Sequence, residues 1–197
     1  MADGALLENV ISDISSKGVK PRLLLHCCCA PCATHVLEYL SGFFLITAYF
    51  FNPNIKPEAE YAKRAGELFK LMEIFSYPNI SKTIVCDYDA AVFDAAAEPF
   101  ADEPEGGMRC RLCFELRLNH TAKAAKDGKF DFFATTLSVS PHKNASLINE
   151  VGCSKAKLFD VGYLISDFKK KGGFQRTIEL SKQYGLYRQR YCGCMYE

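Results

Sequence analysis

Four cysteines crowd into the seven residues 26–32, which read HCCCAPC. The apolar run that ends there, residues 22–26, is typical of a short buried strand, and Pro31 is well placed in the first turn of a following helix. Thiols near a helix N-terminus lie in a positive field that favours thiolate, the form of cysteine that ligates metals. The segment therefore predicts a thiol-based metal or redox site at the end of a strand.

A second group of thiols occurs in MRCRLCFELR, where Cys110 and Cys113 are three residues apart. In a helix this spacing places both sulfurs on one face, where they can bind one metal centre. A C-x-x-C pair alone fits zinc, an iron–sulfur centre or a thioredoxin-like dithiol. Together with the thiols of 26–32 it favours a metal site of four thiolates, which suits zinc and [4Fe–4S] about equally.

The third group of thiols is in LYRQRYCGCMYE, where a single glycine separates Cys192 from Cys194. A disulfide between them would close a very small ring, and strained disulfides are easily reduced. The pair therefore predicts a redox catalyst or relay. The alternative is a frayed terminus with incidental thiols, but Tyr187, Tyr191 and Tyr196 make the tail too apolar for a disordered segment.

Other cysteines and histidines are assigned to packing. Cys86 and Cys153 are expected to be small core residues. Cys27 is expected to point away from its two neighbours, because side chains alternate between the faces of a strand. His26 and His142 are expected to be hydrogen-bonded packing residues and are left out of the metal shell.

Strand and helix signals alternate along the chain. Apolar runs typical of buried parallel strands lie at 22–26, 43–51, 82–86, 130–134 and 157–161. Helical patterns lie at 57–75, 110–126, 142–151 and 174–184. The alternation predicts a doubly wound α/β fold, with a mainly parallel sheet covered by helices on both faces. No glycine-rich phosphate loop is found, so the core is predicted to be Rossmann-like or ATP-pyrophosphatase-like without nucleotide chemistry.

Length and composition limit the class of protein. The 197 residues predict a single domain, 1–197, large enough to bury a core without crosslinks. Ten cysteines and no signal-peptide pattern predict a cytoplasmic protein, in which clustered thiols serve as metal ligands or redox catalysts. The net charge is +1, yet residues 168–197 carry seven Lys or Arg against two Glu. A basic C-terminal face of this kind can attract RNA.

Five sequence blocks carry a resemblance to a known family: HCCCAPC, YFFNPNIKPEAEYAKR, EPEGGMRCRLCFELRL, TTLSVSPHKN and DFKKKGGFQRTIELSKQYGLYRQRYCGC. From about residue 22 to 194 the chain resembles the cobalamin-independent epoxyqueuosine reductases of the QueH type. The resemblance implies a reductase that removes the epoxide oxygen of epoxyqueuosine at the tRNA wobble position, which is the last step of queuosine synthesis.

The same resemblance implies roles for individual residues. It implies a [4Fe–4S] cluster held by Cys28, Cys29, Cys110 and Cys113. It implies a redox-active pair at Cys192 and Cys194. The family pattern is His-x-Cys-Cys-Ala-Pro, and here the variable position is Cys27, which leaves a ligand assignment shifted by one residue open. Cys32 is a further candidate, either for the cluster or for an additional mononuclear iron, and ranks with Cys27 below the first two.

The implied partners are tRNAs with GUN anticodons and an unidentified low-potential electron donor. The segment 165–197, a basic helix plus the Cys-Gly-Cys tail, is expected to complete the active site. Its tyrosines could stack a splayed anticodon base. Its basic residues offer phosphate contacts: Lys169, Lys170, Lys171, Arg176, Lys182, Arg188 and Arg190. Two alternatives stay open, a noncatalytic zinc-binding RNA module and a thiol-disulfide oxidoreductase without metal.

Overall fold

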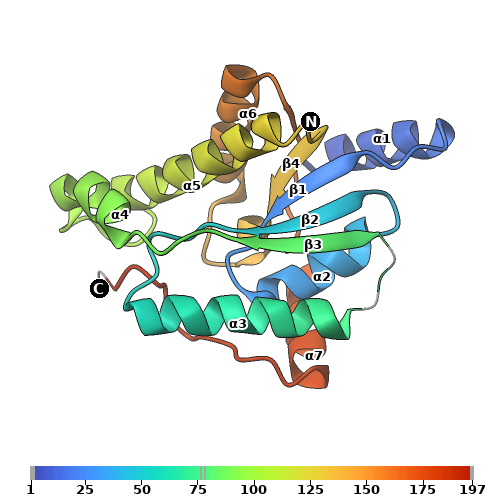
Figure 1. Cartoon of the computed structure of the whole chain (residues 1–197). Helices are drawn as coiled ribbons and strands as arrows, with labels where there is room; N and C mark the ends of the chain where they lie inside the picture. The colour runs from blue at the N-terminus through green and yellow to red at the C-terminus, as the bar shows by residue number, and fades with distance from the viewer. Residues whose placement is uncertain (1–2, 76, 78, 196–197) are drawn as a thin grey trace.

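A five-stranded parallel sheet forms the centre of the molecule in the computed structural model, which describes residues 3–75, 77 and 79–195 (Figure 1). The strands are β1 (Arg22–His26), β2 (Leu45–Phe50), β3 (Ile80–Val85), β4 (Phe132–Thr135) and β5 (Gly162–Tyr163). Their order across the sheet is β3-β2-β1-β4-β5. The chain runs outward from β1 in one direction to β3 and then returns to the other side of β1, so the strand order reverses at β1. Ligands of open α/β sheets bind at the carboxyl ends of the strands at such a reversal.

Helices cover both faces of the sheet (Figure 1). One face packs against α1 (Asp3–Ser16), α2 (Ala30–Leu40), α3 (Glu58–Ile74) and α7 (Gly173–Gln183). The other face packs against α5 (Met108–Asp127) and α6 (Ala145–Phe159), and α4 (Ala90–Ala97) lies against α5. Two short 3-10 turns, η1 (Glu98–Phe100) and η2 (Thr136–Val139), complete the elements. Among the described helices, none is long and apolar enough to cross a membrane.

The central strand β1 fixes where the first thiols lie. It pairs with β2 on one side and with β4 on the other, in register over nearly its whole length. Leu23 and Leu25 are buried on the face of α2 and α3, whereas Leu24 is buried on the face of α5 and α6. Because both edges and both faces of β1 are covered, the segment that follows it leaves the sheet at a well-defined point.

The doubly wound α/β fold predicted from the sequence is confirmed. The strand predicted at 157–161 is wrong, because α6 continues to Phe159 and ends at Asp160 in a left-handed conformation, and β5 begins only at Gly162. A short apolar run at the end of a helix has the same local pattern as a buried strand. Helix α6 is correspondingly longer than predicted, and α1 and α4 had no prediction. Tyr196 lies outside the described residues.

Gly152 allows α6 to pack closely on β5 and gives a test of this packing. A Cβ at residue 152 would overlap the ring of Tyr163, whose hydroxyl is held by Asn149 Oδ1 at 3.1 Å. We expect Gly152→Ala to lower the free energy of unfolding by about 1–3 kcal/mol, as overpacking does. The control is Gly66→Ala in α3, where a Cβ meets no atom within 4 Å and better helix propensity should stabilise by up to about 1 kcal/mol. Urea unfolding followed by circular dichroism measures both, and equal effects of the two substitutions would contradict the packing.

Candidate metal and redox site

Three thiols come together where β1 ends and α2 begins. The sulfurs of Cys28, Cys29 and Cys32 all lie within 4.8 Å of one another, and the sulfurs of Cys28 and Cys29 are 3.9 Å apart. Cys29 is the N-cap residue of α2, and Cys32 lies in its first turn, which Pro31 helps to start. The Thr136 hydroxyl donates a hydrogen bond to the Cys28 sulfur at 3.4 Å. The start of one helix thus gathers three candidate metal ligands.

Cys32, which the sequence analysis ranked below Cys28 and Cys29, lies as close to the group as they do. A second C-x-x-C spacing runs from Cys29 to Cys32 on one helical turn. It is the same signal that was used for Cys110 and Cys113. The overlapping run of cysteines hid this spacing. Cys27 lies outside the group, and it points away from Cys28 as predicted, because it is fully buried in the core on the α2 and α3 face, whereas Cys28 packs on the α5 and α6 face. The Cys27 thiol donates to the Leu25 carbonyl.

His26 is a hydrogen-bonded packing residue, as expected from the sequence. It is fully buried, with Nε2 3.2 Å from the Phe51 carbonyl oxygen and Nδ1 2.8 Å from the Thr135 hydroxyl. Since a carbonyl oxygen can only accept, Nε2 carries the proton and Nδ1 accepts from Thr135. Burial lowers the pKa of His26 to about 3, which keeps the ring neutral. His142 is exposed and lies at the cavity described below.

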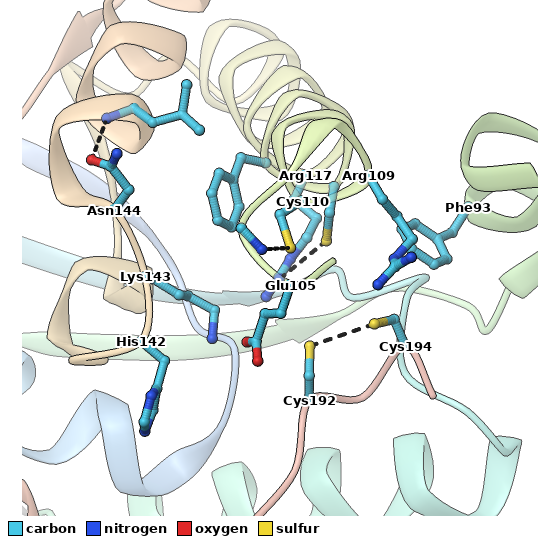
Figure 2. Close-up of a pocket in the computed structure, with 14 residues that line it drawn as sticks. Phe93, Glu105, Arg109, Cys110, Arg117, His142, Lys143, Asn144, Cys192 and Cys194 are labelled. Atoms are coloured by element: carbon cyan, nitrogen blue, oxygen red, sulfur yellow. Dashed lines mark hydrogen bonds between the residues drawn. The ribbon is translucent and has the colours of Figure 1, made fainter. Parts of the chain in front are cut away.

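The second and third thiol groups face each other across a cavity (Figure 2). Cys110 and Cys113 lie in the first turns of α5, and Cys192 and Cys194 come from the C-terminal tail. The Cys194 thiol is 3.7 Å from the Cys192 sulfur, and the backbone N–H of Gly106 donates to the Cys110 sulfur at 3.2 Å. The four residues of the two groups therefore line one space.

The tail that carries Cys192 and Cys194 is packed against the body of the protein. The Lys56 N–H donates to the Gly193 carbonyl at 2.9 Å, and a Cβ at residue 193 would lie 2.8 Å from the Ile55 side chain. Further back, the Tyr187 N–H donates to the Glu67 carboxylate at 2.8 Å. The interpretation of these residues as a frayed terminus is therefore wrong for the part of the tail that the structure describes.

A buried arginine that was not predicted from the sequence connects the thiol groups. Arg117 is 3% exposed on α5, donates to the Asn52 side-chain oxygen at 2.5 Å, and contacts the Cys113 sulfur at 3.7 Å. Asn52 in turn donates to the Cys27 carbonyl at 3.0 Å. The network thus joins the ends of β1 and β2 to α5, and it places a positive charge among the sulfurs.

The sulfurs and their neighbours alter one another's protonation. Hydrogen bonds from Cys29 and Cys32, assisted by the positive charge of Arg117, hold the pKa of Cys28 well below its usual value. A hydrogen bond from Cys194 lowers the pKa of Cys192 to about 5. Cys28 and Cys192 thus favour thiolate at neutral pH, the form that reacts and that binds metal, whereas hydrogen bonding to the Cys28 sulfur raises the pKa of Cys29 and Cys32.

Two adjoining cavities connect the thiol groups. The larger one has a volume of about 570 Å³ and is lined by the thiols after β1 together with tail residues 188–193. The smaller one contains the thiols of α5 and the tail. Residues that line both are Glu105, Arg117, His142, Lys143 and Cys192. The three thiol groups predicted from the sequence therefore open onto one continuous region at the carboxyl end of β1.

The donor set fits a metal centre. Four thiolates about 2.3 Å from one tetrahedral ion have sulfurs about 3.8 Å apart. The separation of 3.9 Å between the sulfurs of Cys28 and Cys29 agrees with that edge. Cys110 and Cys113 lie outside the group of three, but ligands of an iron–sulfur cluster bind different irons and need not converge on one point. The thiols suit zinc or iron, and their positions alone do not select between the two.

The two remaining cysteines lie away from this group. Cys86 follows β3 and is half-buried against the α5 and α6 face, and its carbonyl accepts from the Tyr61 hydroxyl at 2.6 Å. Cys153 is half-buried on α6. Both are less buried than the core positions expected for them.

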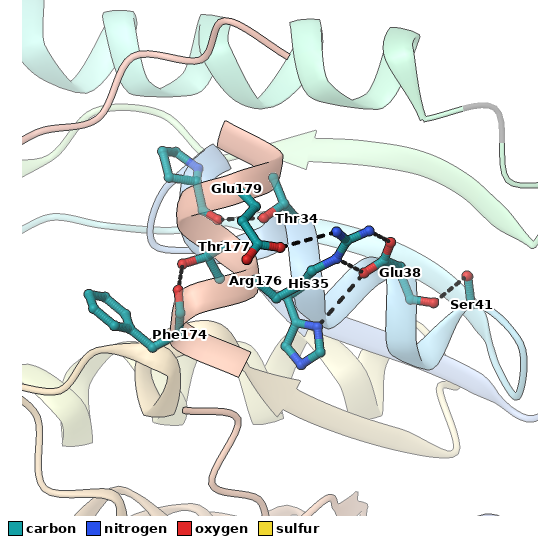
Figure 3. A network of polar contacts seen from close by, with 9 residues as sticks. Thr34, His35, Glu38, Ser41, Phe174, Arg176, Thr177 and Glu179 are labelled. Carbon is teal, nitrogen blue, oxygen red and sulfur yellow. Dashed lines mark hydrogen bonds and ion pairs between the residues drawn. The ribbon is translucent and has the colours of Figure 1, made fainter. Parts of the chain in front are cut away.

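Much of the basic C-terminal charge is already paired. Arg176 on α7 donates to Glu38 at 2.7 Å and to Glu179 at 3.3 Å (Figure 3). Lys169 and Lys170 both pair with Asp167, and Lys171 pairs with Glu8. By contrast, Arg188 and Arg190 line the larger cavity. We therefore expect phosphate contacts chiefly from Arg188 and Arg190, which are the basic residues of the segment nearest the thiols.

Comparison with known proteins agrees with this arrangement. The model of the family described as epoxyqueuosine reductase QueH matches residues 23–197, which include all three thiol groups. The chain belongs to the QueH family. The resemblance recognised in the sequence is therefore confirmed, and with it the assignment to a family of oxidoreductases.

Several QueH proteins are similar over most of the chain, and each bears the name epoxyqueuosine reductase QueH. The Streptococcus pyogenes protein is 44% identical over 182 residues, which cover 91% of this chain and 71% of that protein. The Staphylococcus aureus protein is 42% identical, covering 97% and 81%. The Thermotoga maritima protein is 34% identical, covering 88% of each chain. The similarity thus extends well beyond the cysteine motifs.

The lowered pKa of Cys192 gives a test in the metal-free protein. A thiolate is retained above its pKa, so Cys192 should react with iodoacetamide at pH 6, where a thiol of ordinary pKa is protonated. We expect its alkylation rate, followed by peptide mass spectrometry, to fall only as the pH drops through about 5. Cys194→Ala removes the hydrogen bond and should move this midpoint upward by at least about one unit. Half-buried Cys86, whose pKa is raised by burial, serves as the internal reference, and equal profiles for the two thiols would contradict the assignment.

Proposed function

We propose that this protein is an epoxyqueuosine reductase that acts on tRNA, reducing the epoxide of epoxyqueuosine at the wobble position to give queuosine. The observation that carries the proposal is the convergence of three thiol groups on adjoining cavities at the carboxyl end of β1, in a member of the QueH family. A packing role does not explain this convergence, because thiols at cavity surfaces add little to a core.

The assignment of ligands is part of the proposal. Cys28, Cys29, Cys110 and Cys113 hold a [4Fe–4S] cluster, and such a cluster supplies single electrons at low potential. The proximity of Cys32 to Cys28 and Cys29 supports a second role for this end of the site, in which Cys32 contributes to an additional mononuclear iron. Arg117 offsets the negative charge that the thiolates bring into the interior.

Cys192 and Cys194 are proposed as the redox-active pair. Conversion of an epoxide to an alkene and water consumes two electrons and two protons. Two thiols that join in a disulfide release the same numbers, and a low-potential one-electron donor then restores them in two steps. The closeness of the two sulfurs and the lowered pKa of Cys192 support this role.

The larger cavity supports a nucleotide as substrate. Its volume of about 570 Å³ lies within the roughly 300–1,000 Å³ range of small-molecule sites. Arg188 and Arg190 give it a cationic lining, and Tyr191, 51% exposed at the same cavity, offers an aromatic face. A wobble base splayed out of the anticodon can stack on such a ring while arginines contact phosphates. We place this activity in the cytoplasm, on tRNAs with GUN anticodons.

Cysteine variants test the division of roles. Cys192→Ser and Cys194→Ser should each lower single-turnover reduction of an epoxyqueuosine anticodon stem-loop at least about 100-fold, because one thiol cannot form the disulfide. Their iron and sulfide content should stay near that of the unmodified protein. Cys110→Ser should lose iron and activity together, and Cys153→Ser on α6 is the matched control that should keep both. Loss of iron in the tail variants would instead make Cys192 and Cys194 ligands and contradict the proposed division.

A further inference from the structure

Lys143 occupies the junction between the two cavities, and none of the roles assigned above uses it. It lies in the loop between η2 and α6, directly before Asn144, the N-cap residue of α6. Its side chain lines both cavities. Figure 2 shows it extending into the space between the tail thiols and α5, on the same side as Glu105. The position is fixed because the Asn144 side chain caps α6 by accepting from the Leu147 N–H at 3.1 Å.

The ammonium group of Lys143 has no carboxylate partner among the ion pairs of the described residues. The nearby basic residues Lys169, Lys170 and Lys171, by contrast, each pair with an acid. A half-buried ammonium without a carboxylate partner is costly unless other charges hold it. The groups around it are the thiols Cys28, Cys32 and Cys192 and the guanidinium of Arg117, with Glu105 and His142 on the same cavity walls.

We propose that Lys143 is a catalytic residue that donates a proton to the epoxide oxygen while the first C–O bond of the substrate breaks. The inference rests on the proposed function, because it requires an epoxide to be bound between the thiol groups. The geometry carries it: Lys143 lies on the boundary shared by the cavity large enough for a nucleotide and the cavity that contains the redox-active pair.

A proton from Lys143 neutralises the negative charge that builds up on the epoxide oxygen during the reaction. Cleavage of one C–O bond with entry of electrons leaves negative charge on oxygen, and an alkoxide is a poor leaving group. A proton from Lys143 Nζ converts it to a hydroxyl, and a second proton from solvent lets this oxygen leave as water when the second C–O bond breaks and the alkene forms. In total, two electrons and two protons are consumed, and the electrons come from the low-potential one-electron donor through the thiol site. The neutral amine then regains its proton from solvent in the larger cavity.

Two substitutions separate proton donation from simple charge. In single-turnover reduction of an epoxyqueuosine stem-loop with dithionite, Lys143→Met should lower the maximal rate by about 10²–10⁴-fold, as loss of a general acid does, and should raise the substrate concentration at half-maximal rate by about tenfold at most, because the contact with the epoxide oxygen is lost as well. Lys143→Arg keeps the positive charge but cannot give up a proton at neutral pH, so it should be as slow. Methylammonium added to Lys143→Ala should restore part of the rate. Lys123→Met, at an exposed site on α5, is the matched control.

A binding measurement without reductant gives a readout independent of turnover. The unmodified protein and Lys143→Arg should bind the epoxyqueuosine stem-loop about tenfold more tightly than the queuosine stem-loop, because only the former offers an oxygen to the cation. Lys143→Met should lose this preference. Iron content and visible absorbance confirm that each variant is equally loaded.

The outcomes distinguish this inference from the proposed function. Turnover by Lys143→Met within twofold of the unmodified protein overturns the inference and leaves the reductase intact. Full activity of Lys143→Arg overturns proton donation in favour of charge alone. If the unmodified, metal-loaded protein fails to reduce the stem-loop, the proposed function fails, while the binding preference still shows whether Lys143 meets the epoxide oxygen.

Discussion

The buried guanidinium of Arg117 is the interaction on which the rest of the site depends. It is 3% exposed, and a charge in that position is costly unless it is hydrogen-bonded and compensated. Asn52 and the Cys113 sulfur accept hydrogen bonds from the guanidinium on two different elements, Cys28, whose pKa is lowered, supplies the compensating charge, and Asn52 also holds the backbone at Cys27. One cation thus ties α5 to the ends of the two central strands. Its positive charge also lies close to the thiolates. The attraction between these opposite charges lowers the free-energy cost of burying the arginine and the sulfurs.

The C-terminal tail supplies site thiols that the strands of the sheet do not provide. Parallel strands place side chains at one edge, but β1 alone provides only the first group of thiols. The tail crosses the loop before α3, held by backbone contact between Lys56 and Gly193, and brings a second pair of sulfurs to the opposite wall. The tail therefore lines both the cavity proposed for the substrate and the cavity that contains the proposed redox-active thiols. A change in how the tail packs alters both together.

The sequence predicted the architecture and the three thiol groups because these depend on local patterns. Alternating apolar runs and helical stripes are sufficient for a doubly wound sheet, and C-x-x-C spacing is visible in any chain. The final turn of α6 was mistaken for a strand, since a segment of five residues with three apolar ones is too short to show a helical or a strand period. Arg117 and Asn52 were not predicted at all, because their role depends on a hydrogen bond between two residues that are 65 positions apart in the sequence. Lys143 likewise gains significance only from the two cavities that meet around it.

The claim that these thiols hold an iron–sulfur centre in a reductase is tested most directly by metal analysis of anaerobically purified protein. The account predicts a brown protein with the broad visible absorption of a cysteine-ligated cluster and about four irons and four sulfides per chain. A fifth iron would support the additional site near Cys32. A colourless protein that holds one zinc and takes up no iron on anaerobic reconstitution would contradict the account and favour a zinc-binding RNA module.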